Sequence, residues 1–89
     1  MIEKDIKVEN QMGIHARPAA MLAQTAGKFK ADIKMAKRGI EINVKSIMGI
    51  MMLAAEHGTV LHFTFEGEDE QEAAKAIEEI FTNRFGEEI

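Results

Sequence analysis

The chain has 89 residues, of which 46% are hydrophobic and 29% are charged, proportions close to those of soluble globular domains. Its length predicts a single domain over residues 1–89, and its composition excludes a disordered polymer. It has no cysteine, which excludes a disulfide scaffold, a thiol nucleophile and any cysteine-bound metal site. The formal net charge of -4 argues against a general nucleic-acid binder. No apolar run approaches the length of a membrane span, and the charged N-terminus is unlike a signal peptide, so we expect a cytoplasmic protein.

Charge is distributed unevenly along the chain. Residues 1–53 carry nine lysines or arginines and five acidic residues. Residues 54–89 carry two lysines or arginines and ten acidic residues. Segregated charge on a small domain can orient a charged partner, although salt screens exposed charges beyond about 8 Å at physiological ionic strength. A solvated acidic helix near the C-terminus explains the same pattern, and the two interpretations stay open.

The first half of the chain predicts a strand, a helix and a hairpin. Ile2, Lys4, Ile6 and Val8 alternate with charged residues. This alternation is typical of a strand with one buried face. Pro18 in the opening turn and Gly27 near the end predict a helix over residues 16–28. Two further alternating segments, 33–35 and 40–44, flank a turn that contains Gly39 and predict a hairpin.

The second half predicts a helix, a strand and a longer helix. Ser46 precedes the apolar run 47–55, and serine before such a run is typical of a helix N-cap. Residues 60–65 then place alternate large apolar side chains on one face, as a strand does. Asp69 and Glu72 predict a capping pair for a third helix, which apolar residues at helical spacing extend to Gly86.

The order of these elements is βαββαβα, which predicts an α+β fold. The hairpin makes antiparallel pairing available, and three helices can cover one face of a four-stranded sheet. We therefore expect an open-faced β-sandwich, with a four-stranded antiparallel sheet covered on one face by three helices. The charged residues of the first and third strands are expected to line the open face.

His15 is the main candidate for a chemical role. It stands immediately before a helix, where backbone N–H groups have no partner within the helix and carry a partial positive charge. Such a helix start can hold a phosphate, Arg17 can add charge-assisted hydrogen bonds, and a neutral imidazole is a nucleophile. Gly13 permits an unusual backbone angle, and no acidic residue lies between residues 10 and 29 to compete for Arg17. A histidine at a helix start is also an ordinary polar residue, so these features alone leave the chemistry open.

Two segments of the sequence, GIHARPAAMLAQTAGKF and KSIMGIMMLAAEHGT, resemble HPr, the histidine-containing phosphocarrier family of the bacterial phosphotransferase system. The resemblance covers nearly the whole chain. It implies that His15 accepts a phosphoryl group on Nδ1 from enzyme I, itself phosphorylated by phosphoenolpyruvate, and passes it to an enzyme IIA. The Arg17 side chain and the Ala16 and Arg17 amides would hold the phosphate. The implied protein is a monomeric relay for sugar uptake or its regulation, not an enzyme, and needs no cofactor or metal.

Ser46 matches the family position that an ATP-dependent HPr kinase/phosphorylase modifies. The resemblance therefore implies a regulatory phosphorylation and that kinase as a further partner. Ser46 also has a structural role as an N-cap, which is typically worth about 1 kcal/mol without any regulation. A phosphate there would add about -1.5 to -2 charge beside the docking surface and repel partners without unfolding the domain.

A methionine-rich run follows Ser46. Methionine is common on surfaces that accept several partners. Because a short helix that is apolar all round cannot bury every side, we expect Ile47, Met48 and Met51 to be exposed and the rest packed. The family docks its partners on the first helix and this segment, which implies the following docking residues: Ala16, Ala20, Gln24, Ile47, Met48 and Met51.

Other functions stay open. One is a regulatory HPr-like module controlled through Ser46, and another is a carrier of the nitrogen branch. The acidic tail of residues 85–88 resembles the ending of both nitrogen-branch and proteobacterial relatives. A third is a small interaction domain in which His15 and Arg17 bind a free anion. His57 and His62 have no second ligand at metal-binding spacing, and we expect structural or solvent-facing roles for them.

Overall fold

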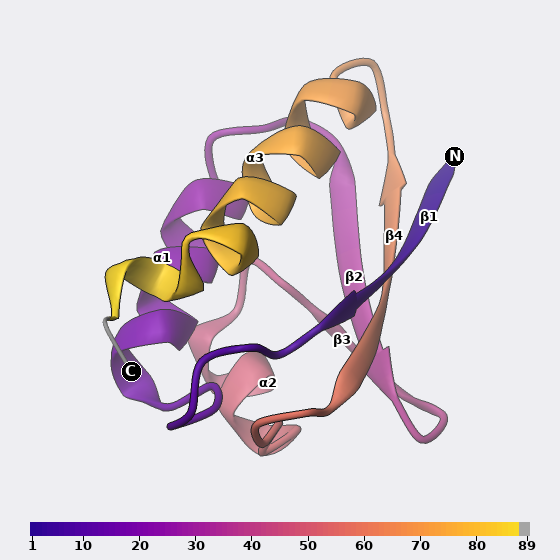
Figure 1. Cartoon of the computed structure of the whole chain (residues 1–89). Coiled ribbons are helices and arrows are strands. Elements are labelled where there is room, and N and C mark those ends of the chain that lie inside the picture. The colour runs from indigo at the N-terminus through magenta and orange to yellow at the C-terminus, as the bar shows by residue number, and fades with distance from the viewer. Residues whose placement is uncertain (88–89) are drawn as a thin grey trace.

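The computed structural model describes residues 1–87 and has two layers, an antiparallel sheet and the helices that cover one of its faces (Figure 1). The strands are β1 (Ile2–Lys7), β2 (Asp32–Lys37), β3 (Ile40–Asn43) and β4 (Val60–Glu66), in the spatial order β1-β4-β2-β3. The helices are α1 (Ala16–Ala26), α2 (Ile47–Met52) and α3 (Glu70–Thr82), followed by the short 3-10 helix η1 (Arg84–Gly86). The predicted α+β open-faced β-sandwich is confirmed.

The sheet buries one face and leaves the other in water, as alternation along its strands requires. Across the β1–β4 pair, Ile6 lies opposite Leu61 on the covered face, whereas Asp5 lies opposite His62 on the open face. The charged residues of β1 and β3 that line the open face are Glu3, Asp5, Lys7 and Glu41. The prediction that these two strands present charge to solvent is therefore correct.

A row of phenylalanine rings joins the sheet to the C-terminal segment. Phe63 of β4 meets Phe81 of α3 edge to face, with ring centroids 5.6 Å apart, and Phe81 meets Phe85 of η1 at 4.9 Å. All three rings are buried. An edge-to-face pair adds about 0.5–1.5 kcal/mol beyond its buried area, so this row fixes the position of η1 against the core.

Helix α2 is shorter than the sequence predicts. The apolar run over residues 47–55 suggested a helix of eight or nine residues, but α2 ends at Met52, and Ala54 has a left-handed φ of 48°. Ile47, Met48 and Met51 are exposed and Ile50 is buried, as predicted. Met52 was expected to pack and is instead 79% exposed, because a six-residue helix turns only one side toward the core.

The start of α3 differs from the predicted capping pair. Asp69 occupies the N-cap position but makes no side-chain capping bond. Its carboxylate instead accepts hydrogen bonds from the backbone N–H groups of Lys30 and Ala31, at 2.8 Å each. Glu70, not Glu72, reaches back to accept from the N–H of Gly67 at 3.1 Å. Asp69 thus ties the start of α3 to the loop before β2, a contact that local spacing does not reveal.

The end of α3 also differs from the prediction of a helix up to Gly86. The helix stops at Thr82, and Arg84 and Phe85 both adopt left-handed backbone angles, with φ of 51° and 57°. This reversal of the chain directs Glu87 back toward the start of α1. Over residues 1–87, no helix has the length and apolar character needed to cross a membrane.

Candidate functional site

The loop before α1 is held against the turn after α2. Gly13 has a φ of 70°, and a Cβ atom at this position would lie 2.7 Å from the carbonyl oxygen of Ala55. The N–H of Ile14 donates to the same carbonyl at 2.9 Å, and the Ile14 side chain is buried. Only glycine combines this backbone angle with this approach. The position of residue 15 is therefore fixed by backbone contacts on its N-terminal side.

His15 is the N-cap residue of α1. Its backbone is extended, with φ of -90° and ψ of -167°, and its side chain makes no capping hydrogen bond. The Ala16 and Arg17 amides have no intrahelical acceptor, and Pro18 has no N–H to add. The first turn of α1 carries no acidic residue. The helix start is thus an electropositive position beside a half-exposed imidazole, as the sequence predicts.

Glu87 contacts the imidazole of His15, although 72 residues separate them in the chain. Oε2 of Glu87 lies 2.7 Å from Nε2 of His15, and Oε1 accepts a hydrogen bond of 3.0 Å from Nδ2 of Asn10. The second Asn10 amide hydrogen goes to the carbonyl of Gly13 at 2.6 Å. Asn10 is fully buried. Both of its N–H groups point to acceptors, which fixes the orientation of the amide.

The electrostatic surroundings keep Glu87 ionised. Partial desolvation raises its pKa, but the hydrogen bonds from His15 and Asn10 and the nearby charges of His15 and Arg17 outweigh that effect, and the pKa lies below its usual range. The expectation that no acidic residue competes for Arg17 is therefore wrong. It considered only neighbours in the sequence, whereas the acid arrives from the end of the chain.

Arg17 lies beside the same carboxylate without a tight contact. Its Nη1 is 3.8 Å from Oε2 of Glu87, and the side chain is 59% exposed. At this separation the pair is a loose surface ion pair, which typically contributes little to stability. The guanidinium is therefore free to reorient toward an anion placed at the start of α1.

Ser46 caps α2, as its spacing predicts. Its Oγ accepts a hydrogen bond of 3.0 Å from the N–H of Gly49, and the residue is exposed. A Cβ at Gly49 would lie only 3.3 Å from this Oγ, so the first turn of α2 closes tightly around the hydroxyl.

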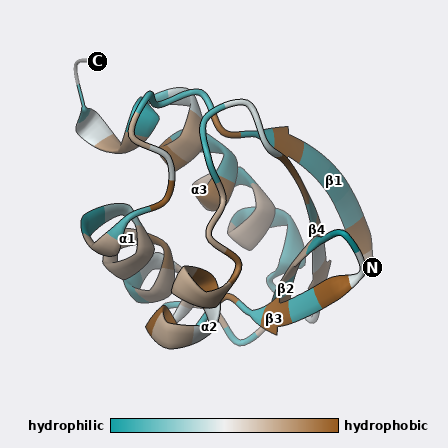
Figure 2. Cartoon of the chain, turned by 90° about the horizontal axis from the view of Figure 1, so that it is seen from below, coloured by the Kyte–Doolittle hydropathy of each residue, from teal (hydrophilic) through white to brown (hydrophobic). Residues whose placement is uncertain are grey.

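The expected docking residues lie on two neighbouring helices. Figure 2 shows α1 and α2 side by side, with hydrophobic positions along α2. Ala16, Ala20 and Gln24 follow one another at a spacing of four on α1, so they share one face, and all three reach the surface. The α2 residues Ile47, Met48 and Met51 are exposed beside them. We call these six residues the α1–α2 face.

The other two histidines have polar partners of their own. Nδ1 of His57 is 3.3 Å from the carbonyl of Asn10 and supports the loop before α1. His62 lies on the open face of the sheet, between Asp5 at 2.7 Å and Glu3 at 3.0 Å. Over residues 1–87, no group of three His, Asp or Glu side chains has a geometry suited to a metal ion.

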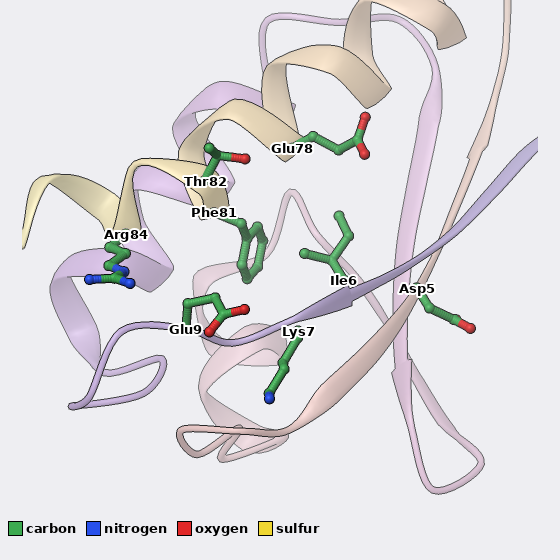
Figure 3. A pocket seen from close by; sticks show the side chains of 8 residues that line it. All are labelled: Asp5, Ile6, Lys7, Glu9, Glu78, Phe81, Thr82 and Arg84. Carbon is green, nitrogen blue, oxygen red and sulfur yellow. The ribbon is translucent and has the colours of Figure 1, made fainter.

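Two hollows show what the surface offers to ligands. One, of about 490 Å³, is lined by His15, by the loop before it and by residues 54–57. The other, of about 460 Å³, lies between β1 and α3, where Ile6 and Phe81 form an apolar wall among charges of both signs (Figure 3). Of these two hollows, His15 lines only the first.

Known proteins share this sequence and this architecture. The family model described as "PTS HPr component phosphorylation site" matches residues 2–83. The phosphocarrier protein HPr of Xylella fastidiosa is 47% identical over 87 residues, 98% of each chain. The HPr-like protein Crh of Halalkalibacterium halodurans is 44% identical over 77 residues, 86% of this chain and 92% of that protein. The crystal structure of HPr-C-His from Thermoanaerobacter tengcongensis superposes with a TM-score of 0.96 at 46% identity and covers 100% of both chains.

The family model spans all four strands and all three helices, including the histidine at the start of α1. The relatives cover the chain almost from end to end, so the match does not rest on one motif. The chain therefore belongs to the HPr family and is a phosphoryl carrier of the phosphotransferase system.

Proposed function

We propose that His15 is the residue that carries the phosphoryl group. The observation that supports this is the placement of its imidazole at the unpartnered N-terminus of α1, half-exposed and beside Arg17. The lone pair of Nδ1 attacks the phosphorus of the donor, a nitrogen–phosphorus bond forms, and the donor's bond to phosphorus breaks with its electron pair on the donor. The Ala16 and Arg17 amides and the Arg17 guanidinium then hold the phosphoryl oxygens.

The donor in this proposal is phosphorylated enzyme I, and the acceptor is an enzyme IIA. Both bind the α1–α2 face, where an apolar patch of adaptable side chains adjoins the imidazole. The protein acts as a cytoplasmic relay formed by a single domain of residues 1–89, and not as an enzyme. It works as a monomer without metal or cofactor, since the phosphoryl group passes from one protein to the next through one side chain.

The test is labelling of the purified chain by phosphoenolpyruvate and enzyme I. We expect acid-labile phosphate on His15, located by mass spectrometry, and no label on the His15→Ala variant. His62→Ala is the matched control, because it removes an imidazole from the open face of the sheet and leaves the start of α1 intact. Equal labelling of the His15→Ala and wild-type proteins would show that another residue is the carrier.

We further propose that Ser46 is a regulatory phosphorylation site for an HPr kinase/phosphorylase. Its exposed hydroxyl at the start of α2, next to Ile47 and Met48, supports the proposal. A phosphate here would place about two negative charges beside the α1–α2 face and weaken docking. Incubation with ATP and the kinase should give acid-stable phosphate on Ser46, whereas a label on another serine or threonine, or none with active kinase, would contradict this role.

A further inference from the structure

Glu87 makes the most direct contact with the imidazole of His15 in the described part of the chain. Glu87 follows η1, whose residue Phe85 has a left-handed backbone angle. The N–H of Glu87 donates to the carbonyl of Arg84 at 2.9 Å. Phe85 anchors this turn, because its ring is buried against Phe81. The carboxylate is therefore delivered to His15 by a packed segment.

The carboxylate has its own fixed partners. Oε1 accepts from the buried Asn10 amide at 3.0 Å, which leaves Oε2 directed at Nε2 of His15 at 2.7 Å. The Asn10 amide in turn donates to Gly13, in the loop that places the imidazole. Asn10, Glu87 and His15 thus form one hydrogen-bonded chain that links the loop to the ring.

The protonation of the imidazole follows from this contact. An ionised carboxylate can only accept hydrogen bonds, so Nε2 of His15 must carry the hydrogen. In a neutral imidazole the other ring nitrogen then has a free lone pair. Over residues 1–87 no group hydrogen-bonds to Nδ1, and the side chain takes no part in capping the helix. The contact therefore selects Nδ1 as the nucleophile.

We propose that Glu87 is a positioning residue for phosphoryl transfer, which holds His15 as the Nε2–H tautomer and presents Nδ1 to the donor. This inference rests on the proposed role of His15. When Nδ1 bonds to phosphorus, the ring keeps its Nε2 hydrogen and becomes formally positive, and Glu87 continues to accept that hydrogen bond. The carboxylate thus offsets ring charge on one edge while Arg17 and the helix amides meet the phosphoryl oxygens on the other.

The experiment combines nitrogen-15 NMR of the histidine rings with transfer kinetics. At a pH where the imidazole is neutral, the wild-type spectrum should show His15 as the Nε2–H tautomer. Glu87→Ala should introduce the Nδ1–H tautomer and slow phosphorylation by enzyme I about tenfold, the lower end of the loss seen when the hydrogen-bond partner that orients a metal-bound histidine is removed. Glu87→Gln has one acceptor oxygen for two donors, the Asn10 amide and Nε2–H of His15, so it should give a mixture of tautomers and a rate between those of the wild type and Glu87→Ala. Glu79→Ala, an exposed position on α3, is the charge-matched control and should behave as wild type.

The outcomes separate this inference from the carrier role. A wild-type protein labelled on His15, with the tautomer and rate of Glu87→Ala unchanged, overturns the positioning role alone. A wild-type ring that is mainly the Nδ1–H tautomer also overturns it, whatever the variants do. Absence of label on wild-type His15, with the Nε2–H tautomer observed, would instead contradict the proposed function. If Glu87→Ala is too unstable to measure, the wild-type spectrum and the Glu87→Gln variant still test whether Glu87 sets the tautomer of His15.

Discussion

In the free protein, Arg17 lies near the Glu87 carboxylate. A bound phosphoryl group would attract the Arg17 guanidinium more strongly than this carboxylate does. Its guanidinium is 3.8 Å from Glu87 and largely in water, so little is lost when it turns away. A phosphoryl dianion at the start of α1 presents several acceptor oxygens, which a guanidinium binds in a bidentate manner. The side chain can therefore exchange one partner for the other during transfer.

We predict that Arg17→Glu slows phosphoryl transfer from enzyme I by at least about tenfold, because it replaces an attractive charge at the site with a repulsive one. Initial rates of label incorporation, measured at several ionic strengths, check this, and added salt should narrow the difference. Arg38→Glu makes the same charge change in the exposed β2–β3 turn and serves as control. Equal rates for both variants would refute the clamp role.

Ser46 has a structural role in α2 that is separate from its proposed regulatory role. We predict that Ser46→Ala lowers the free energy of unfolding by about 1 kcal/mol, because the N–H of Gly49 loses its acceptor. Ser46→Asp should keep the stability, since aspartate is an equally good cap, and should still reduce docking through its charge. Urea denaturation measures the first effect and the KM of enzyme I for the variant measures the second. A stable Ser46→Ala protein would show that the cap is dispensable.

At the scale of elements, the docking proposal depends on α2. Its six residues are apolar, and four of them are exposed, which is an unusual use of hydrophobic side chains in a short surface helix. Met52, which was expected to pack, enlarges this exposed patch. The helix is also held at both ends, by Ser46 and by the left-handed turn at Ala54, so the patch has a defined shape.

We predict that Met48→Asp raises the KM of enzyme I for the carrier about tenfold and leaves the melting temperature nearly unchanged. The side chain is 76% exposed, so the charge costs little in the free protein but must be desolvated in a complex. Val60→Asp, which changes an exposed residue on the open face of the sheet, is the control. If both variants transfer equally well, docking does not use α2.

Strands and helices were predictable wherever one local pattern dominated. Alternation placed β1 and β4 correctly, and the Ser46 cap marked the start of α2. The end of α2 was not predictable, because the apolar run continues past Met52 and only the left-handed angle at Ala54 stops the helix. Periodicity carries no information about such a turn when no glycine marks it.

Some residues of the candidate site could likewise be predicted from local sequence, and one could not. His15 and Arg17 could be found because the start of a helix is a local feature with known chemistry. Glu87 could not, because it reaches His15 only through the turn at η1 and the packing of Phe85 on Phe81. A contact across 72 residues depends on how the whole core closes. Of the acidic tail noted in the sequence, Glu88 lies outside the described residues.

At the scale of the whole molecule, charge and docking surface are separated. The residues of α1 and α2 include Arg17 and no acidic side chain, whereas α3 carries several glutamates. The acidic side chains of α3 therefore lie away from these two helices, whereas Glu87 contacts His15 at the start of α1. In the proposed transfer, the phosphoryl group would meet the Arg17 guanidinium and the start of α1 on a protein of negative net charge, with the Glu87 carboxylate at the other edge of the imidazole.

The sheet carries a pH-dependent link between β1 and β4 on the face opposite the helices. Hydrogen bonds from His62 to Asp5 and then Glu3 raise the pKa of His62 above 6.5, and the nearby carboxylate charges add to the shift. The folded state therefore binds this proton more tightly than the unfolded chain does. Its contribution to stability is fully present below pH 6.5 and is lost as the pH rises through the raised pKa.

We predict that the free energy of unfolding of the wild-type protein, relative to that of His62→Gln, falls as the pH rises from about 6 to about 8, where histidine titrates. The difference between the two proteins isolates His62, because they differ only at that residue. The effect should be small and should shrink in high salt, since all three side chains are exposed. Urea denaturation at a series of pH values measures it. A difference that stays constant or grows with pH would mean that the folded protein does not favour protonated His62, and that β1 is held to β4 by backbone pairing and the packing of Ile6 and its neighbours alone.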